Sequence, residues 1–424
     1  MSADPSIVDR NGDTTREGAL EGVRIADFSW AAATPIATRM LADHGATVVR
    51  VESKTHVDTV RITGPFRNNE SGINKSGFYA DFNSSKYGIA LDMKQKSAHA
   101  IARRLIEWAD VVVESFTPRV MAGWQLAYSD IVQWKPEVIM LSSCMQGQSG
   151  PYRDYPGFGG QGAALAGLHY LTGWPDRVAA GPKGAYTDGI APRFVASAIL
   201  AALEYRERTG IGQHIDFAQV EAAISGFIAT EVLDYTVNGK IAGSIGNRSP
   251  HYAPHGCFAC RGEDRWITIA IESDAQWVAL RAAMGDPAMG DPKWAADAKF
   301  QNAEGRLAHQ DEIEREIETW TRQHDAFDLA NRLQSCGIPA APVQNAADLF
   351  SDPQLAHRGH FRPLDHVEMG TVSYNGPAHL LSETPAVVRW AAPCLGEHTA
   401  QVLREFLGYS IDEISEFSAL GLLA

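Results

Sequence analysis

Asp188 is the residue whose type and position best suit covalent chemistry in this sequence. It lies in the stretch GAYTDGIAPRFVASAILAALEYRERTG, residues 184–210. Apolar residues recur there at helical spacing: Val195, Ile199, Leu200 and Leu203. Pro192 suits a first turn and Gly210 a helix end, so we predict a helix over 190–208. Asp188 could cap backbone N–H groups at the start of this helix or act as a nucleophile, and spacing alone favours the cap.

A second cluster has the residue types of a zinc site: His251, His255, Cys257 and Cys260. Its compact H-x3-H-x-C-x2-C order matches none of the usual structural zinc spacings. The surrounding CFACRGEDRWITIAI is typical of two strands joined by a polar turn. We therefore expect no metal, and we interpret the five cysteines as reduced thiols.

The glycines of a dinucleotide-binding motif, G-x-G-x-x-G, occur at Gly157, Gly159 and Gly162. Proline and charged residues precede them, whereas the motif requires a strand at that place. The first predicted βα loop, FSWAAATP at 28–35, contains no glycine that would let a pyrophosphate approach the backbone. A NAD-dependent dehydrogenase is therefore kept only as an alternative.

Composition and charge define the class of protein. The chain has 424 residues, of which 45% are hydrophobic and 21% charged, as in a globular protein of two or three lobes. A formal net charge of −14 argues against a general nucleic-acid binder. The N-terminal residues form neither a signal peptide nor a transit peptide, and no apolar run approaches the roughly 20 residues of a membrane span. We expect a cytoplasmic protein that binds neither nucleic acid nor membrane.

Strands and helices alternate through the first half of the chain. We predict strands over 23–28, 47–52, 88–93, 111–115, 138–143 and 214–218, and helices over 35–44 and 97–108. Right-handed crossovers between successive strands make them parallel. The sequence therefore predicts an α/β fold with a Rossmann-like parallel sheet, covered by helices on both faces, that binds ligands at the carboxyl ends of its strands.

A change of composition near residue 243 marks a domain boundary, because GSIGNRSPHYAPHG is polar and rich in turn residues. The expected ranges are a polar N-terminal extension at 1–20, a large α/β domain at 21–242, a smaller mixed α/β domain at 243–345 and a C-terminal segment at 346–424 that returns to the large domain. One helix should follow the strand at 214–218, three should lie in the smaller domain near 275–284, 310–323 and 325–336, and a last helix should cover 398–407.

Several segments together resemble the class III CoA-transferases, the CaiB/BaiF family, which also includes 2-methylacyl-CoA racemases. The similar segments are LEGVRIADFSW, MLADHGATVVRVES, FNSSKYGIALDMK, VVVESFTP, GQSGPY, YTDGIAPRFVASAILAALEYRERTGIGQHIDFAQVEAA, CGIPAAPV and LGEHTAQVLREFLGYSIDEI. They occur in the expected order from about residue 20 to residue 415. A slight further likeness points to the benzylsuccinate or aryl-acid branch.

The resemblance implies an interlocked dimer, built either from two copies or from this chain and a paralogous subunit. It implies acyl-CoA and carboxylic acid substrates, with coenzyme A carried covalently by Asp188. The amide of Gly189 would then donate to an oxyanion. Ala33, Lys86 and Phe116 fall on CoA-binding segments of the family. Ser53 replaces a frequent arginine, so Lys54, Arg61 and Arg119 become candidates for the phosphates.

The resemblance leaves alternatives within and beyond the family. A racemase would carry an acid–base histidine where this sequence has Phe158, so racemisation is disfavoured. A non-catalytic, CoA-binding subunit of a larger transferase is a further alternative. We predict a CoA-transferase that moves CoA from an acyl-CoA such as succinyl-CoA to an aryl- or alkyl-substituted organic acid. Four cations are candidates for a second carboxylate of that acid: Arg39, Arg177, Lys183 and Arg248.

Overall fold

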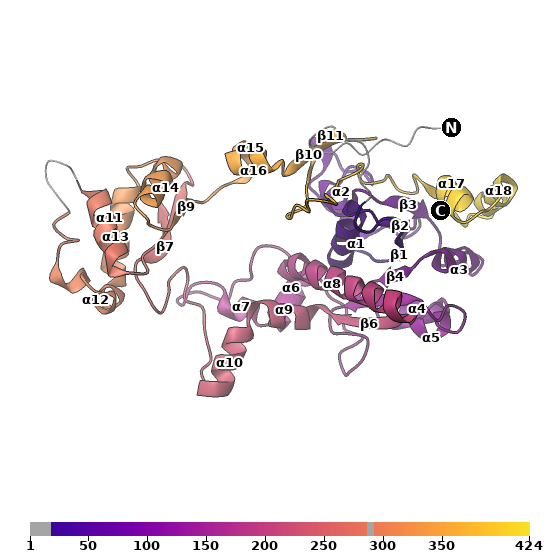
Figure 1. Cartoon of the computed structure of the whole chain (residues 1–424), viewed down its shortest axis with the longest axis horizontal. Helices are drawn as coiled ribbons and strands as arrows, with labels where there is room; N and C mark the ends of the chain where they lie inside the picture. The colour runs from indigo at the N-terminus through magenta and orange to yellow at the C-terminus, as the bar shows by residue number, and fades with distance from the viewer. Residues whose placement is uncertain (1–17, 286–291) are drawn as a thin grey trace. The chain divides into compact units, whose positions relative to one another are not determined.

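The computed structural model describes residues 18–285 and 292–424, which form two compact units (Figure 1). Of the described residues, the larger unit contains the chain from residue 18 to His169, Gly181–Ile241 and Gln354–Ala424. The smaller unit contains Tyr170–Ala180 and Ala242–Pro353. Each unit has its own buried core.

The divisions between the units differ from the expected domain ranges in two places. Tyr170–Ala180 belongs to the smaller unit although it lies inside the range expected for the large domain. The smaller unit also extends to Pro353, past the expected end at 345. The boundary expected after residue 242 lies beside the division after Ile241. The polar extension expected at 1–20 falls almost entirely outside the described residues.

A six-stranded parallel sheet forms the centre of the larger unit, with the order β3-β2-β1-β4-β5-β6. Its strands are β1 (Arg24–Asp27), β2 (Thr47–Glu52), β3 (Tyr87–Ala90), β4 (Val111–Glu114), β5 (Ile139–Cys144) and β6 (Gln213–Ala218). The predicted parallel α/β sheet is therefore confirmed. The order reverses between β1 and β4, and ligands of such sheets bind beyond the carboxyl ends of strands at this switch point.

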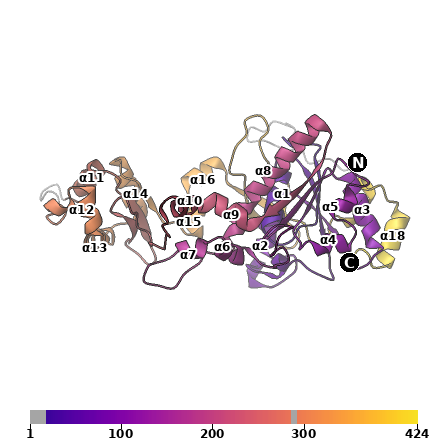
Figure 2. The same ribbon diagram turned by 90° about the horizontal axis from the view of Figure 1, so that it is seen from below.

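Alternate residues of the strands point to opposite faces of the sheet, as the pleat requires. Ile25 packs in one core with helices α1 (Ala33–Asp43) and α8 (Tyr186–Thr209). Its neighbour Ala26 packs in the other core with α3 (Ala98–Trp108). The helices α1 and α8 and the helix α3 thus cover different faces (Figure 2).

The C-terminal segment completes the second of these cores. Val402 and Leu403 are buried in the same cluster as Ile101 and Leu105 of α3. In both views the yellow C-terminal helices lie beside α3 (Figures 1 and 2). The helix expected at 398–407 is a short α17 (Thr399–Gln401) followed by a π-helical turn, and α18 (Ile411–Ala419) was not predicted.

Other elements of the larger unit refine the sequence prediction. The single helix expected after β6 is divided at Ile228 into α9 (Gln219–Phe227) and α10 (Ala229–Asn238). No residue of α10 is buried. The remaining elements of this unit include α2 (Gly77–Asn83), α4 (Arg119–Gly123), α5 (Tyr128–Ile131), α6 (Gly159–Leu165), and the antiparallel hairpin of β10 (Phe361–His366) and β11 (Gly370–Asn375).

The smaller unit is a three-stranded antiparallel sheet packed against helices. Its strands are β7 (His255–Ala259), β8 (Trp266–Ala270) and β9 (Ala340–Pro342), and its helices include α11 (Asp274–Met284), α12 (Ala303–Ala308), α13 (Gln310–Thr321), α14 (Ala326–Ser335) and α15 (Ala346–Ser351). Trp277 and Phe300 lie fully buried in its core. None of the described helices has the length and hydropathy that crossing a membrane requires.

A buried ion pair stands at the carboxyl end of β2. Arg61 donates from Nε and Nη2 to the two oxygens of Glu52, each at 2.8 Å, and its guanidinium stacks on the ring of Tyr79. Tyr79 donates its hydroxyl to Glu52 at 2.7 Å. Burial alone would raise the pKa of Glu52, but the charges of Arg61 and Arg50 outweigh it and lower that pKa to about 2.

We expect Arg61→Met to destabilise the protein by about 3–5 kcal/mol, because it leaves the Glu52 charge buried without its partner. The free energy of unfolding can be measured by urea denaturation followed by tryptophan fluorescence. Arg208→Met is the matched control, since Arg208 forms an exposed pair with Glu204 that should contribute little. Equal effects of the two substitutions would contradict the role given to the buried pair.

Candidate active site

A hollow of about 370 Å³ opens beyond the carboxyl ends of β1, β4 and β5 in the larger unit. The loop after β1 lines it with Trp30 and the first residues of α1, and the loop after β4 adds Phe116. Asp188 and Gln219 line it as well. The hollow therefore lies at the switch point of the sheet, where a ligand is expected.

Asp188 does not cap its helix. The helix α8 begins at Tyr186, with Ala185 in the N-cap position and no hydrogen bond from a capping side chain. Asp188 is therefore in the first turn, its own N–H donates to Ala185 O at 2.9 Å, and Pro192 lies inside the helix. The interpretation of Asp188 as a helix cap, which spacing favoured, is wrong. The helix starts at Tyr186 and not at the predicted residue 190.

The Asp188 carboxylate is instead held by a side chain that the sequence analysis did not single out. Gln219, the first residue of α9, donates from Nε2 to Asp188 Oδ1 and to Thr187 Oγ1, the latter at 3.0 Å. Thr187 donates its hydroxyl to Gly159 O at 3.0 Å. Gln219 and Thr187 are buried, whereas Asp188 is partly accessible to the hollow.

Two glycines of the G-x-G-x-x-G motif are required by packing around this carboxylate. A Cβ atom on Gly159 would lie 2.7 Å from Asp188 Cγ. A Cβ atom on Gly162 would lie 2.8 Å from the sulfur of Met145 and 2.9 Å from Thr187 Oγ1. Both glycines belong to α6, so the motif serves close packing of α6 against Asp188 and its neighbours, in a different setting from a dinucleotide loop.

The environment of Asp188 alters its acidity. Burial raises the pKa of Asp188 to about 6, and the hydrogen bond from Gln219 opposes that rise. Among the described residues lining the hollow, the other titratable side chains are Cys144 and Tyr155, and no lysine, arginine or histidine is present. The carboxylate is thus a poorly solvated anion, which favours nucleophilic attack more than a fully hydrated surface aspartate would.

A second hollow, of about 320 Å³, lies beyond β2 and β3 and shares Trp30, Phe116 and Val120 with the first. Its wall is largely aromatic, since the rings of Trp30 and Phe116 are 6.0 Å apart and those of Phe116 and Trp124 are 5.5 Å apart. His56 and Lys94 stand at this hollow. A flat or flexible ligand could therefore extend from the second hollow towards Asp188.

The loop between β1 and α1 is held in place by hydrogen bonds to buried charged side chains. Asp58 accepts from the N–H of Ala31 at 3.0 Å, and Arg50 donates to Asp58 and, at 2.9 Å, to Ser29 O. Ala31 has a φ of 62°, which is unusual for a residue with a side chain. These contacts fix the backbone that carries Ala33, a buried residue lining the first hollow.

The cations expected at the phosphates lie in two different settings. Lys86 is fully buried and donates from Nζ to Asp27, Asn83 and Pro35 O at 3.1, 3.0 and 2.8 Å. Lys86 and Arg61 are thus committed to the interior, and the structure does not support a phosphate contact for either. Lys54 and Arg119 are exposed but line neither hollow.

The structure brings together residues that sequence reasoning missed. Lys94 and His56 follow β3 and β2 and reach the second hollow. Their position just past the carboxyl ends of predicted strands was the available signal. Gln219 offered a similar signal, because it directly follows β6. Gly189, expected beside the nucleophile, is exposed in the first turns of α8, and its carbonyl accepts from Arg193.

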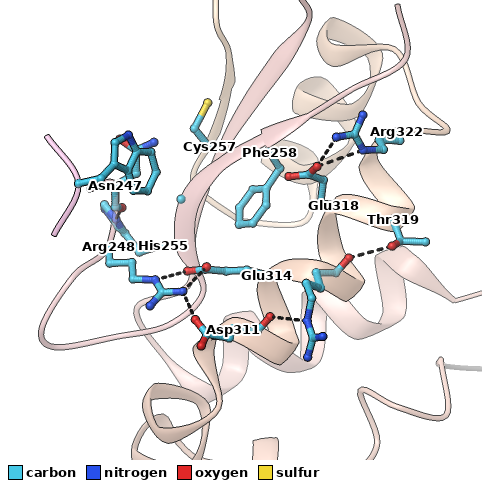
Figure 3. Close-up of a pocket in the computed structure, with 13 residues that line it drawn as sticks. Asn247, Arg248, His255, Cys257, Phe258, Asp311, Glu314, Glu318, Thr319 and Arg322 are labelled. Atoms are coloured by element: carbon cyan, nitrogen blue, oxygen red, sulfur yellow. Dashed lines mark hydrogen bonds and ion pairs between the residues drawn. The ribbon is translucent and has the colours of Figure 1, made fainter. Parts of the chain in front are cut away.

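The smaller unit has a hollow of its own, of about 670 Å³ (Figure 3). Arg248 points at Glu314, to which it donates at 2.9 and 2.6 Å, and also at Asp311. The positive charge of Arg248 is therefore already paired with two carboxylates, so the structure does not support a contact between Arg248 and a substrate carboxylate. Arg39 is buried against Asp43 at 3.2 Å, so it is similarly committed.

The histidines and cysteines of the H-x3-H-x-C-x2-C segment, where we expect no metal, are not gathered into one site. His255 and Cys257 line the hollow of the smaller unit, whereas Cys260 is buried in the core of that unit. Across residues 18–285 and 292–424, no three His, Cys, Asp or Glu side chains are grouped so that they could hold a metal ion.

The chain is similar to known proteins along nearly its whole length. The sequence pattern described as CoA-transferase family III matches residues 20–399. Succinyl-CoA–D-citramalate CoA-transferase of Chloroflexus aurantiacus is 29% identical over 400 residues, covering 94% of this chain and 97% of that protein. Succinate–glutarate CoA-transferase of Agrobacterium fabrum is 32% identical over 394 residues, covering 92% and 96%.

The fold has a close counterpart among solved structures. A CaiB/BaiF family protein from Brucella suis superposes with a TM-score of 0.83 and 28% identity. The match covers 92% of this chain and 100% of that one.

We expect Gly159→Ala to destabilise the protein by about 1–3 kcal/mol and to displace Asp188, because the new methyl group has no room beside the carboxylate. Gly160→Ala is the matched control, since nothing lies within 4 Å of its Cβ position in the same helix. It should stabilise α6 by about 0.5–1 kcal/mol. Urea denaturation of both variants checks this, and a stable Gly159→Ala protein with Asp188 in place would contradict it.

Proposed function

The chain belongs to CoA-transferase family III, and we propose that it moves coenzyme A from an acyl-CoA donor to an organic acid through a thioester on Asp188. The observation that carries this proposal is the Asp188 carboxylate, held by Gln219 at the edge of a hollow that has no neighbouring cation among its described lining residues. A carboxylate in this setting is ionised near neutral pH yet only partly solvated, as a nucleophile should be.

The proposed reaction exchanges bonds of similar energy. The Asp188 carboxylate attacks the thioester carbonyl of the donor, the C–S bond breaks, and CoA leaves as a thiolate. The thiolate then attacks Asp188 Cγ in the resulting anhydride and releases the donor acid as its carboxylate. An acceptor carboxylate next attacks Cγ and displaces the thiolate, which finally attacks the acceptor's acyl carbon and restores the aspartate. Donor acid and acceptor thus exchange CoA without hydrolysis.

The two hollows, which share Trp30, Phe116 and Val120 in their lining, support a path for the CoA substrate. Trp30 and Phe116 form a shared aromatic wall against which the adenine or pantetheine portion can pack. Lys94, at the second hollow, is the cation best placed for a phosphate. Lys54 and Arg119, which are exposed, are kept as outer phosphate contacts.

We propose succinyl-CoA as the donor, because the curated relatives compared above carry succinyl-CoA or succinate in their names. The other acids in their names, citramalate and glutarate, are dicarboxylic acids. An aryl or alkyl substituent on the acceptor is supported by the first hollow, whose described lining residues include Tyr155 and Phe158 and no lysine, arginine or histidine. The likeness to the benzylsuccinate branch stays a prediction.

Two alternatives lose support from the geometry. A racemase needs two opposed bases, and the residue at the expected histidine position is Phe158, on the rim of the hollow. A dehydrogenase would need its glycines between a strand and a helix for a pyrophosphate, whereas Gly159 is closed off by Asp188.

The interlocked dimer also stays a prediction, with a cytoplasmic location. It is supported by α10, which has no buried residue and exposes Leu233, Tyr235 and Val237. A second copy or a paralogous subunit would remove this apolar surface from water.

We expect a hydroxylamine-sensitive CoA adduct on the peptide that contains Asp188 after mixing the protein with succinyl-CoA. Intact-protein and peptide mass spectrometry would detect it. Asp188→Asn should form no adduct and lose transfer activity, because the amide is a poor nucleophile.

The control for this experiment is Glu204→Gln, which alters an exposed carboxylate of the same helix, α8, and should leave the adduct unchanged. Transfer that continues in Asp188→Asn would rule out the mechanism. Purified protein that binds CoA but never forms an adduct with any donor would favour the non-catalytic subunit instead.

Activity should depend on the ionisation of Asp188. Since the pKa of Asp188 is raised to about 6 and the reactive form is the anion, kcat/KM should fall about tenfold per pH unit below that value. Between pH 7 and 8 it should change little from this cause. A pH profile measured with succinyl-CoA checks the sign, and activity undiminished at pH 4.5 would contradict it.

A further inference from the structure

Each attack on Asp188 Cγ converts one oxygen of the side chain into an oxyanion. This occurs when the CoA thiolate opens the anhydride and again when the acceptor acid displaces the thiolate. Suppose that Oδ1 is the oxygen that stays on Cγ as the carbonyl oxygen. In the first step the Cγ–Oδ2 bond then breaks, and in the second step the Cγ–S bond breaks. A donor aimed at Oδ1 would therefore act in both steps.

Gln219 already donates to that oxygen. Its Nε2 bonds to Asp188 Oδ1 and to Thr187 Oγ1 at 3.0 Å. The orientation of the amide follows from its partners, because an ionised carboxylate can only accept. Thr187 uses its hydroxyl hydrogen on Gly159 O at 3.0 Å and so offers a lone pair to Gln219. Both neighbours therefore require the NH₂ side of the amide.

The arrangement is also rigid. Gln219 and Thr187 are buried, with 7% and 0% of their surfaces exposed. Gly159 packs closely against the carboxylate, since even a methyl group there would lie 2.7 Å from Cγ and 2.8 Å from Oδ1. A donor that is already in place need not reorganise as charge develops, which is where catalytic hydrogen bonds gain most.

We propose that the side-chain amide of Gln219 is a catalytic oxyanion donor for both attacks on Asp188 Cγ, and that Thr187 is the positioning residue that orients it. This inference rests on the proposed thioester at Asp188. It assigns Oδ1 as the oxygen retained on Cγ and leaves Oδ2 to form and break the bond to the acyl group.

Gln219 also influences the resting carboxylate. Burial raises the pKa of Asp188 and the Gln219 hydrogen bond lowers it, so removing the amide should raise that pKa further. Cys144 and Tyr155 are the other titratable groups among the described residues lining the hollow. The acid limb of the pH profile should therefore move to higher pH in a variant that lacks the donor.

The test measures how fast the preformed thioester is discharged. Wild type, Gln219→Met and Thr187→Val are loaded with succinyl-CoA and freed of small molecules, and loss of the adduct in hydroxylamine or acceptor acid is followed by intact mass. Hydroxylamine attacks the same carbon, so it reports on Cγ without acceptor binding. We expect Gln219→Met to discharge about 10²–10³-fold more slowly, and Thr187→Val to be slowed less.

The direction of the effect separates catalysis from structure. Loosened packing would expose the thioester and leave its discharge by hydroxylamine unchanged or faster, and either result would overturn the proposal. Gln133→Met is the matched control, because Gln133 is exposed and bonds only weakly to Ser129 O at 3.4 Å. If Gln219→Met does not fold, Thr187→Val with a wild-type discharge rate would overturn the proposal alone.

Failure of the two proposals can be told apart. Wild type that never forms the adduct would refute the thioester on Asp188, and the role of Gln219 with it. An adduct that forms on Asp188 and discharges at the wild-type rate in Gln219→Met would refute only the role of Gln219.

Discussion

A set of buried charges at the carboxyl ends of β1 and β2 is the constraint on which the site depends. Arg50 is fully buried and links Ser29 O to Asp58, which in turn holds the N–H of Ala31. Removing such charges from water is costly, so they persist only where every partner is in place. The loop between β1 and α1, which lines the hollow, is therefore fixed by hydrogen bonds to buried charged groups. In dinucleotide-binding folds the corresponding loop is rich in glycine.

The contacts of Asp188, the proposed nucleophile, differ from those of a helix cap. The carboxylate of a capping aspartate would accept hydrogen bonds from backbone N–H groups, which would make it a weaker base. Asp188 lies in the first turn of α8 and lines the hollow. Its Oδ1 accepts a hydrogen bond from Gln219. Burial raises the pKa of Asp188. The carboxylate is not engaged in capping α8 and stays available to a ligand in the hollow.

The sequence predicted the parts of the structure that depend on local patterns. Runs such as TVVRVE and VVVES mark the strands of the parallel sheet, and the family-like segments single out Asp188. The position of Gln219 directly after β6 marks it as a site candidate. Its hydrogen bond to Asp188 could not be inferred, because it joins residues of α9 and α8 that only the tertiary structure brings together. The burial of Lys86 could not be inferred either, since a lysine in a polar segment gives no sign of a buried partner such as Asp27.

The return of the C-terminal segment to the sheet governs the order of assembly. Val402 and Leu403 belong to the same core as Ile101, so that core stays incomplete until the last part of the chain has left the ribosome. Most of the smaller unit is continuous, Ala242–Pro353, and can form first. During synthesis the unfinished sheet exposes the face that the C-terminus later covers. Premature termination near residue 400 would therefore yield a chain in which part of this core is open to aggregation and chaperone capture.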